Sequence, residues 1–341
     1  MIRSTPSSGS PTARDAAHLL STRRWACAFA LLVLLVALPL HALAAAAAPD
    51  CPPQATAPDA QRVAAGMHDA KDRGYLWRVR RDGRTSYLYG TIHVARPEWM
   101  FPGPRTTAAL AASDTLALEI DMLDADMQAR LAAALHGRGV TVLPAPLAAR
   151  VERRFVAECV DPAAMRTLAP EFQVATLMVL AARRDGLDPS YGIDLMLGVV
   201  ARSLAKETVS LETPEAQFAA LAMPTPAATI EFVTAGLDEL ESGRARPLLA
   251  RLAKAWSTSD LAELEGYARW CDCLNTDAER DAMKRMLDDR NPALADAIAK
   301  LHDGGETVFA AVGSLHMIGP NGLPALLARR GFSVEAVRFD R

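Results

Sequence analysis

Two short stretches near opposite ends of the chain share one pattern, an apolar run that breaks at a glycine and is followed three residues later by a histidine. The first closes with Gly90-Thr91-Ile92-His93 and the second with Gly313-Ser314-Leu315-His316. A glycine at the end of a strand lets the backbone turn sharply or approach another group closely. Each histidine then lies beyond a strand end, where α/β proteins bind ligands. We therefore expect both histidines to be functional.

Strand patterns lie toward both ends of the chain and helical patterns lie mostly between them. Asp82-Gly83 separates the first two strands and is a strong hairpin signal. The pattern predicts an α/β fold over residues 71–341, with a mixed central sheet, flanking helices and a large helical insertion over about residues 145–303. Residues 49–70 have the composition of a linker and N-terminal extension. The predicted strands are residues 75–81, 85–91, 115–120, 208–212, 307–312 and 333–339.

Residues 1–48 have the pattern of an export signal and its cleavage region. Arginines precede an apolar run over residues 25–40, and Ala42-Leu43-Ala44 fits the small-x-small cleavage pattern. The run is shorter than the roughly 20 residues that a membrane span usually needs. We therefore expect a cleaved signal peptide, a periplasmic or secreted mature protein and no permanent membrane anchor.

The net charge of the chain and the distribution of its charged residues bear on the kind of molecule that it binds. The chain has a formal net charge of −3, with 23% charged residues, and no basic patch stands out in it. Nucleic-acid-binding domains usually carry such a patch. We expect a peptide or small-molecule substrate and no nucleic acid.

Four cysteines remain after removal of the signal, namely Cys51, Cys159, Cys271 and Cys273. An even number in an oxidising compartment favours two disulfides. A bridge within the Cys-x-Cys doublet would close a very short loop, so we expect Cys51 and Cys159 each to pair with one cysteine of the doublet. Free buried thiols are the alternative.

Two glutamates, Glu119 and Glu212, stand at the ends of apolar strands. A buried carboxylate is costly unless it is paired, and an arginine, a divalent metal or a substrate would each serve. His93, His316 and Glu119 would suit zinc, manganese, cobalt or iron, and such a metal would lower the pKa of a bound water. Without metal, the same residues offer a histidine general base oriented by glutamate. Arg290-Asn291, at a predicted helix end just before Pro292, would contact an oxyanion or a carboxylate.

Taken in order, these motifs resemble the TraB/GumN family, which belongs to a wider grouping with the Tiki, erythromycin-esterase and ChaN-like proteins. The resemblance extends from about residue 70 to the C-terminus, and within the family the chain is similar to exported bacterial GumN or YbaP-like members. The matching segments are Trp77 and residues 87–94, 118–119, 191–194, 211–217, 290–291, 309–316 and 319–327.

The resemblance implies a mixed α/β fold in which both Gly-x-x-His histidines and the first glutamate surround one site. The Tiki site is similar to that of a metal-dependent protease, usually supported by manganese or cobalt. This implies His93, Glu119 and His316 as catalytic residues and metal ligands, with Arg290 as a further catalytic residue. The related esterases work through histidine and glutamate without metal, the ChaN-like relatives bind haem iron, and TraB-type relatives are linked to peptide-pheromone shutdown.

We therefore expect a hydrolase of peptide or amide bonds that depends on a divalent metal (manganese, cobalt or zinc). Asp194 and Glu212, which lie in the matching segments, are expected to bind substrate. Two alternatives are a metal-free His/Glu esterase and a non-catalytic protein that binds a peptide or haem. In the binding alternative, the aromatic residues of the segment 99–101 would line the crevice.

Overall fold

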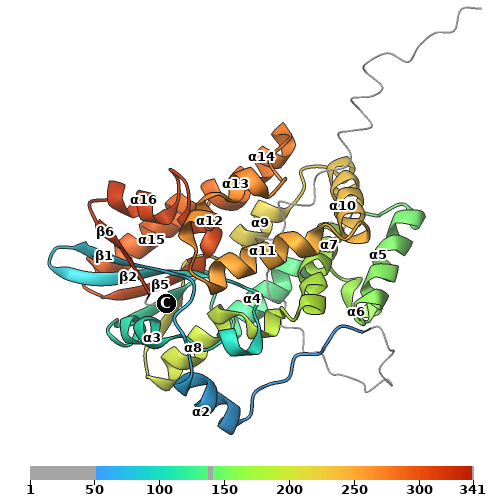
Figure 1. Ribbon diagram of the computed structural model, residues 1–341. Helices are drawn as coiled ribbons and strands as arrows, with labels where there is room; N and C mark the ends of the chain where they lie inside the picture. The colour runs from blue at the N-terminus through green and yellow to red at the C-terminus, as the bar shows by residue number, and fades with distance from the viewer. Residues whose placement is uncertain (1–50, 137–140, 340–341) are drawn as a thin grey trace, which may run out of the picture.

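The computed structural model describes residues 51–136 and 141–339 (Figure 1). The predicted signal peptide and its cleavage pattern lie outside these residues. All six predicted strands are present in the described part of the chain. They are β1 (Tyr75–Arg81), β2 (Arg84–Thr91), β3 (Thr115–Leu118), β4 (Glu207–Ser210), β5 (Val308–Gly313) and β6 (Ser333–Val337).

The strands form one sheet in the order β4-β3-β5-β2-β1-β6. The first four in this order run parallel to one another. At the other edge β1 pairs antiparallel with β2, and β6 pairs antiparallel with β1. The expected mixed α/β fold is therefore confirmed. Strand β5 comes late in the sequence but lies between β2 and β3, so the two Gly-x-x-His motifs occupy neighbouring strands, with Thr91 opposite Gly313.

The β1–β2 hairpin follows from its two turn residues. Asp82 and Gly83 both adopt left-handed conformations, with φ of 52° and 75°. A two-residue turn of this kind matches the right-handed twist of the flanking strands. Arg81 and Arg84 therefore pair directly across the turn. The predicted hairpin is confirmed, and its second strand begins one residue earlier than expected.

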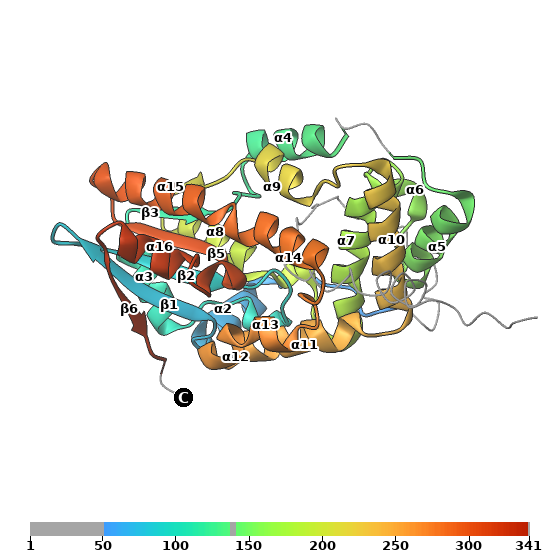
Figure 2. The same ribbon diagram turned by 90° about the horizontal axis from the view of Figure 1, so that it is seen from above.

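Helices cover both faces of the sheet. In Figures 1 and 2, α15 and α16 lie over one face and α3 and α8 over the other, while α5, α6, α7 and α10 pack together away from the sheet. The expected helical insertion is interrupted by β4, which returns to the sheet edge. The helices, with 3-10 or π turns labelled η, are α2 (Ala60–His68), η2 (Pro97–Trp99), α3 (Pro104–Ala111), α4 (Ala125–His136), α5 (Ala145–Ala157), α6 (Pro162–Met165), α7 (Pro170–Leu180), η3 (Ala181–Asp185), η4 (Pro189–Tyr191), α8 (Ile193–Ser203), α9 (Pro214–Leu221), α10 (Pro226–Glu241), α11 (Ala245–Ser257), α12 (Leu261–Glu265), α13 (Tyr267–Trp270), α14 (Asp277–Met283), η5 (Lys284–Asp288), α15 (Asn291–Asp303), η6 (Ser314–Met317) and α16 (Leu323–Arg329).

The predicted disulfide pairing is wrong. Cys51 bonds Cys159, and the two cysteines of the doublet, Cys271 and Cys273, bond each other. The residue between them, Asp272, has a φ of 52°. This left-handed turn accompanies a Cα–Cα distance of 5.1 Å, which is within the normal range for a bridge. The left-handed conformation of Asp272 therefore brings the two cysteines close enough to bond. The predicted pairing was wrong because it considered only the length of the loop and not this conformation.

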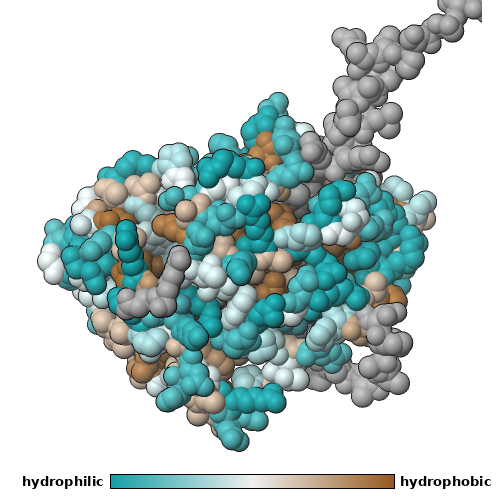
Figure 3. Space-filling view, in the orientation of Figure 1, coloured by the Kyte–Doolittle hydropathy of each residue, from teal (hydrophilic) through white to brown (hydrophobic). Residues whose placement is uncertain are grey.

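Hydrophilic side chains cover most of the face seen in Figure 3, with apolar ones scattered between them.

In the described part of the chain no single helix has the length and apolar character of a membrane span. Together, α9 and α10 meet those criteria, but they are bent by 81° at their junction.

Candidate functional site

The predicted site residues gather at the carboxyl ends of the four parallel strands. Parallel strands place their carboxyl ends at one edge of a sheet, and ligands of α/β proteins bind there. Two further residues reach this edge from helices, one in the first turn of α8 and one immediately before α15. The structure therefore brings together all six candidates, which are His93 after β2, Glu119 after β3, Glu212 after β4, His316 in η6 after β5, Asp194 in α8 and Arg290 before α15.

Gly313 makes the close approach of three of these side chains feasible. A Cβ atom at this position would lie 3.2 Å from Glu119 Oε1, 3.4 Å from His93 Nε2 and 3.7 Å from His316 Cδ2. The Gly313 N–H also donates a hydrogen bond of 2.7 Å to Glu119 Oε1. The glycine of the second motif thus admits the two histidines and the glutamate to one small volume.

Arg290 is the cation that pairs with both glutamates. Its guanidinium donates from Nε to Glu212 Oε1 at 2.9 Å and from Nη2 to Glu119 Oε2 at 2.7 Å, with a further bond from Nη2 to Glu212 Oε2. Nη1 donates to the Met286 carbonyl at 2.9 Å and lies 3.3 Å from His316 Nε2. Burial lowers the pKa of Arg290, but the two glutamates raise it above its ordinary value, so the side chain stays charged.

A π-helical turn, η5, ends two residues before Arg290. In it the Asp289 N–H donates to the Lys284 carbonyl, five residues earlier, at 2.9 Å. Turns of this kind insert one residue into a helix and often lie at functional sites. Here the turn lies between α14 and α15 and directs the Arg290 side chain toward the strand ends.

His316 is neutral and oriented by two neighbours. Arg290 can only donate, so His316 Nε2 accepts from it and the ring proton is on Nδ1. That proton is donated to Asn291 Oδ1 at 2.5 Å, and the Asn291 amide in turn donates to the Asn321 carbonyl at 2.8 Å. Burial and the charge of Arg290 lower the pKa of His316 to about 3, and the charge of Glu119 opposes them only in part.

His93 has the opposite protonation state. Its Nδ1 donates to Asp194 Oδ2 at 2.8 Å. Burial lowers the pKa of His93, but the charge and hydrogen bond of Asp194, together with the charge of Glu119, raise it to about 9. Gly192 permits this pairing, because a Cβ atom there would lie 2.9 Å from the His93 carbonyl oxygen. At neutral pH His93 is therefore an imidazolium whose Nε2 lies on the side of Gly313 and Glu119.

Glu119 is an ionised carboxylate despite its burial. Burial raises its pKa, but the charges of Arg290 and His93, the Gly313 N–H and, in the acid range where His316 is protonated, the charge of His316 together lower it to about 2. The site therefore holds two groups with widely separated pKa values, the His93 imidazolium and the Glu119 carboxylate.

Two neutral amides complete the cluster, of which the sequence analysis selected only Asn291, together with Arg290. Gln217 Nε2 donates to Glu119 Oε2 at 3.2 Å and to Glu212 Oε2 at 3.1 Å. Asn291, described above, holds His316. Both lie inside the segments that carried the family resemblance, and Gln217 is one turn into α9, which Thr213 caps. The matching segment therefore contained a signal for Gln217, but a neutral amide on a helix does not by itself indicate a site.

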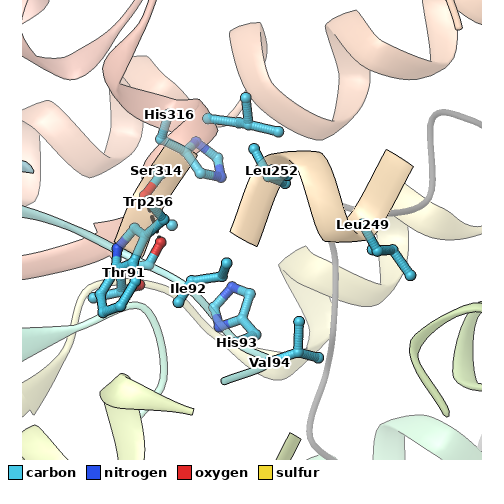
Figure 4. A pocket seen from close by; sticks show the side chains of 11 residues that line it. Thr91, Ile92, His93, Val94, Leu249, Leu252, Trp256, Ser314 and His316 are labelled. Atoms are coloured by element: carbon cyan, nitrogen blue, oxygen red, sulfur yellow. Dashed lines mark hydrogen bonds between the residues drawn. The ribbon is translucent and has the colours of Figure 1, made fainter. Parts of the chain in front are cut away.

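A small cavity opens beside the two histidines (Figure 4). Its volume is about 30 Å³. The segment 99–101 does not line it, because Trp99 packs against Trp256 with ring centroids 6.4 Å apart and Phe101 lies against Gly66. The lining residues are Thr91, Ile92, His93, Val94, Leu249, Leu252, Trp256, Gly313, Ser314, Leu315 and His316.

The described donor set does not fit the expected divalent metal. Over residues 51–136 and 141–339, no three His, Cys, Asp or Glu side chains are grouped so that they could hold a metal ion. Both ring nitrogens of His316 are already hydrogen-bonded, and at neutral pH His93 carries the proton that a metal would have to displace. The guanidinium of Arg290 contacts the same carboxylates that a cation would need. We derive no chemical step through a metal.

Comparison with known proteins gives a family and no closer relative. The model of the TraB/PrgY/gumN family matches residues 75–336, a span that contains all six candidate residues and the sheet up to the next-to-last residue of β6. The match confirms the resemblance inferred from the sequence. No curated protein and no solved structure matches the chain significantly.

Proposed function

The chain belongs to the TraB/PrgY/gumN family, and from the geometry of its site we propose that it is a hydrolase of ester, amide or peptide bonds. In this proposal His93 is the proton donor and Glu119 is the proton acceptor. Arg290 and Gln217 hold Glu119 in place, His316 is hydrogen-bonded to Arg290, and Asp194 orients His93.

One observation carries the proposal, namely that Glu119 Oε1 and His93 Nε2 meet at Gly313, where a Cβ atom would lie 3.2 Å from the first and 3.4 Å from the second. Surroundings that push the pKa values of neighbouring groups apart are typical of acid–base pairs in active sites. His93, with a pKa of about 9, can donate at neutral pH, and Glu119, with a pKa of about 2, is ionised and able to accept. The hydrogen bond from His93 Nδ1 to Asp194 leaves Nε2 as the donor toward the reaction.

The proposed reaction conserves protons over the cycle. Glu119 accepts a proton from a water molecule as the water oxygen attacks the carbonyl carbon of the substrate. His93 donates its Nε2 proton to the leaving nitrogen or oxygen as the bond to that carbon breaks. Transfer of the proton from Glu119 to His93 restores both groups, and the low pKa of Glu119 favours this return. Each proton transfer of this kind typically contributes about 10²–10⁴-fold to the rate.

The test is hydrolysis by the chain without its predicted signal, measured on chromogenic short-chain esters and on a peptide library read by mass spectrometry. We expect His93→Gln and Glu119→Gln each to reduce kcat/KM by about 10²–10⁴-fold. His68→Gln is the matched control, since the side chain of His68 is 87% exposed. Hydrolysis that persists unchanged in both site variants would contradict the proposal.

The same samples separate the alternatives that the sequence raised. The metal-dependent enzyme would be favoured if chelation abolishes activity and manganese, cobalt or zinc restores it. Binding of that metal should then require His93 and His316. A Soret band on titration would favour haem binding, and tight binding of peptides that remain intact would favour capture. Activity that survives chelation supports the acid–base pair proposed here.

A further inference from the structure

Residues 51–68 form a strap that lies outside the family match. In Figure 1 the strap is blue, extended at first and ending in α2. The Cys51–Cys159 disulfide ties its first residue to the domain. Beyond its other end, the Asp72 carboxylate accepts hydrogen bonds of 3.1 and 3.0 Å from the first N–H groups of α3. The strap is therefore held at both ends.

Packing holds the strap only weakly. Pro52 is buried, but the other residues of the strap are exposed or half-buried, and α2 has no buried residue. At Gly66, α2 lies against the ring of Phe101, which is 2.2 Å from where a Cβ atom would be. Burial of apolar surface is the main force that holds segments together. The position of the strap therefore depends strongly on its disulfide.

Midway along its extended part, the strap is hydrogen-bonded to Tyr191. The Thr56 N–H donates to Tyr191 Oη at 2.9 Å, and this hydroxyl donates to the Thr56 carbonyl at 3.4 Å. Tyr191 is buried, and a buried tyrosine hydroxyl usually needs such a partner. The strap therefore satisfies a polar group of the domain.

Tyr191 belongs to the segment 188–194, which pairs with the segment 92–95. Asp188 and Ala95 exchange two backbone hydrogen bonds, of 2.8 and 3.1 Å. The first segment carries Asp194 and the second carries His93. A change in the position of Tyr191 would therefore be felt at the pairing that supports the site.

The side chains at the other end of this pairing belong to the site. Asp194 follows Tyr191 by three residues and accepts the hydrogen bond of 2.8 Å from His93 Nδ1. Between them, Gly192 lies directly against the His93 carbonyl, 2.9 Å from where its Cβ atom would be. Contacts therefore run without a break from the disulfide, through the strap and Tyr191, to His93.

We propose that the strap is a redox-dependent brace of the candidate site, with Tyr191 as the positioning residue. When Cys51 and Cys159 are bonded, the strap stays on Tyr191 and the segment 188–194 holds Asp194 against His93. When the bond is reduced, the strap leaves Tyr191 and this pair loses its fixed geometry. The statement that the brace controls hydrolysis rests on the proposed function.

The exposure of the two bridges supports this assignment. Cys159 is exposed and Cys51 is half-buried, whereas Cys271 and Cys273 are buried. Exposed disulfides are the ones that exchange readily with thiols. The bridge that holds the strap is therefore the one that responds to its surroundings.

The redox step is an exchange with a protein disulfide. The thiols of Cys51 and Cys159 lose two protons and two electrons as their S–S bond forms. The oxidant, a disulfide of another protein, takes up the electrons and protons and becomes a dithiol. Oxidising compartments supply such oxidants, whereas the cytosol keeps thiols reduced. The brace would consequently form after the export that the sequence predicts.

The test compares the oxidised and reduced forms of the chain without its predicted signal. Cys271→Ala/Cys273→Ala is the background, so that only the strap bridge responds to dithiothreitol. Hydrogen exchange is followed by NMR at the N–H groups of Ala95, Asp188 and Ile193. On reduction we expect exchange at these positions to rise about tenfold or more beyond any rise in β3 and β5, which report global opening. We also expect kcat/KM to fall about tenfold or more, because small displacements of catalytic groups reduce rates strongly.

A second variant tests the contact itself and leaves the bridge intact. Tyr191→Phe removes only the hydroxyl that holds the strap, and the oxidised variant should reproduce the excess exchange. Tyr75→Phe is the matched control, because the Tyr75 hydroxyl also donates to a backbone carbonyl, that of Asp260, at 3.2 Å. It should leave exchange in the segments 92–95 and 188–194 unchanged.

Two results would overturn the inference. One is a reduced protein that stays folded and shows no excess exchange in these segments. The other is an oxidised Tyr191→Phe protein that behaves like Tyr75→Phe, and this result decides alone if reduction unfolds the whole chain. Failure of the proposed function would look different, since hydrogen exchange gives its answer even in a protein that cleaves no ester or peptide.

Discussion

Replacement of Asp194 by asparagine removes the negative charge behind His93 and keeps an oxygen that can accept its Nδ1 proton. In the native site burial lowers the pKa of His93, while Asp194 and Glu119 raise it from 6.5 to about 9. Without the charge of Asp194, burial is opposed mainly by Glu119. We expect the pKa of His93 in Asp194→Asn to fall to 6.5 or below.

The magnitude of the effect on stability follows from the size of the pKa shift of His93. A rise from 6.5 to about 9 corresponds to a stability contribution on the order of 3 kcal/mol. Because the folded protein binds this proton more tightly than the unfolded chain, the contribution is complete below pH 6.5 and is lost as the pH rises through 9. The variant lacks most of it. The difference in free energy of unfolding between the two proteins should therefore shrink by about that amount between pH 6 and pH 10.

Two measurements check this expectation. Histidine NMR titration, with His93→Gln used for assignment, gives the pKa directly, and urea denaturation across the pH range gives the stability difference. In activity, the alkaline limb of kcat/KM should move from near pH 9 to near 6.5 or below. Asp69→Asn is the matched control, because Asp69 pairs with His68 at an exposed position, where such a pair contributes little. A His93 pKa that stays near 9 in Asp194→Asn, or a stability difference that is constant with pH, would refute the reasoning.

Three further predictions concern the buried ion pairs and the covalent framework. Arg290→Met leaves two buried carboxylates without a cation and should destabilise the protein by about 3–5 kcal/mol in denaturant titrations, with partial recovery when both partner glutamates become glutamine. Joint replacement of Cys51 and Cys159 by alanine should reduce stability by up to about 4–5 kcal/mol, because the bridge spans a sequence separation of 108, whereas loss of the Cys-x-Cys bridge should have a much smaller effect. Intact mass of the exported protein should show an N-terminus near Ala45, and a start at Met1 would contradict the predicted cleavage.

The sequence predicted the strands because their apolar patterns and turn residues are local. Asp82-Gly83 fixed the hairpin, and both Gly-x-x-His motifs marked strand ends. The order of the strands was not predicted, since nothing local indicates that β5 inserts between β2 and β3. Yet this insertion is what places the two motifs side by side.

The sequence predicted where the site lies, but it did not predict which of the charged side chains in the site pair with one another. Arg290 stood at a predicted helix end, where an arginine is usually solvated. Its partners Glu119 and Glu212 are 171 and 78 residues away in sequence, so only the fold brings them within hydrogen-bond distance. The role of Gln217 was not predicted for a related reason. It depends on Glu119 and Glu212, to which the Gln217 side-chain amide donates hydrogen bonds.

The two motifs are alike in sequence, but their histidines differ in charge. His93 faces the carboxylates of Asp194 and Glu119 and has a pKa of about 9, whereas His316 faces Arg290 and has a pKa of about 3. Neighbours from distant segments therefore decide what each histidine can do. A metal ion that used both imidazoles would require His93 to lose its proton and Arg290 to release His316. Metal binding to this site should consequently release protons, and its affinity should increase with pH up to about 9. Affinity that is independent of pH from 6 to 9 would show that metal binds elsewhere or that the charges differ from those described.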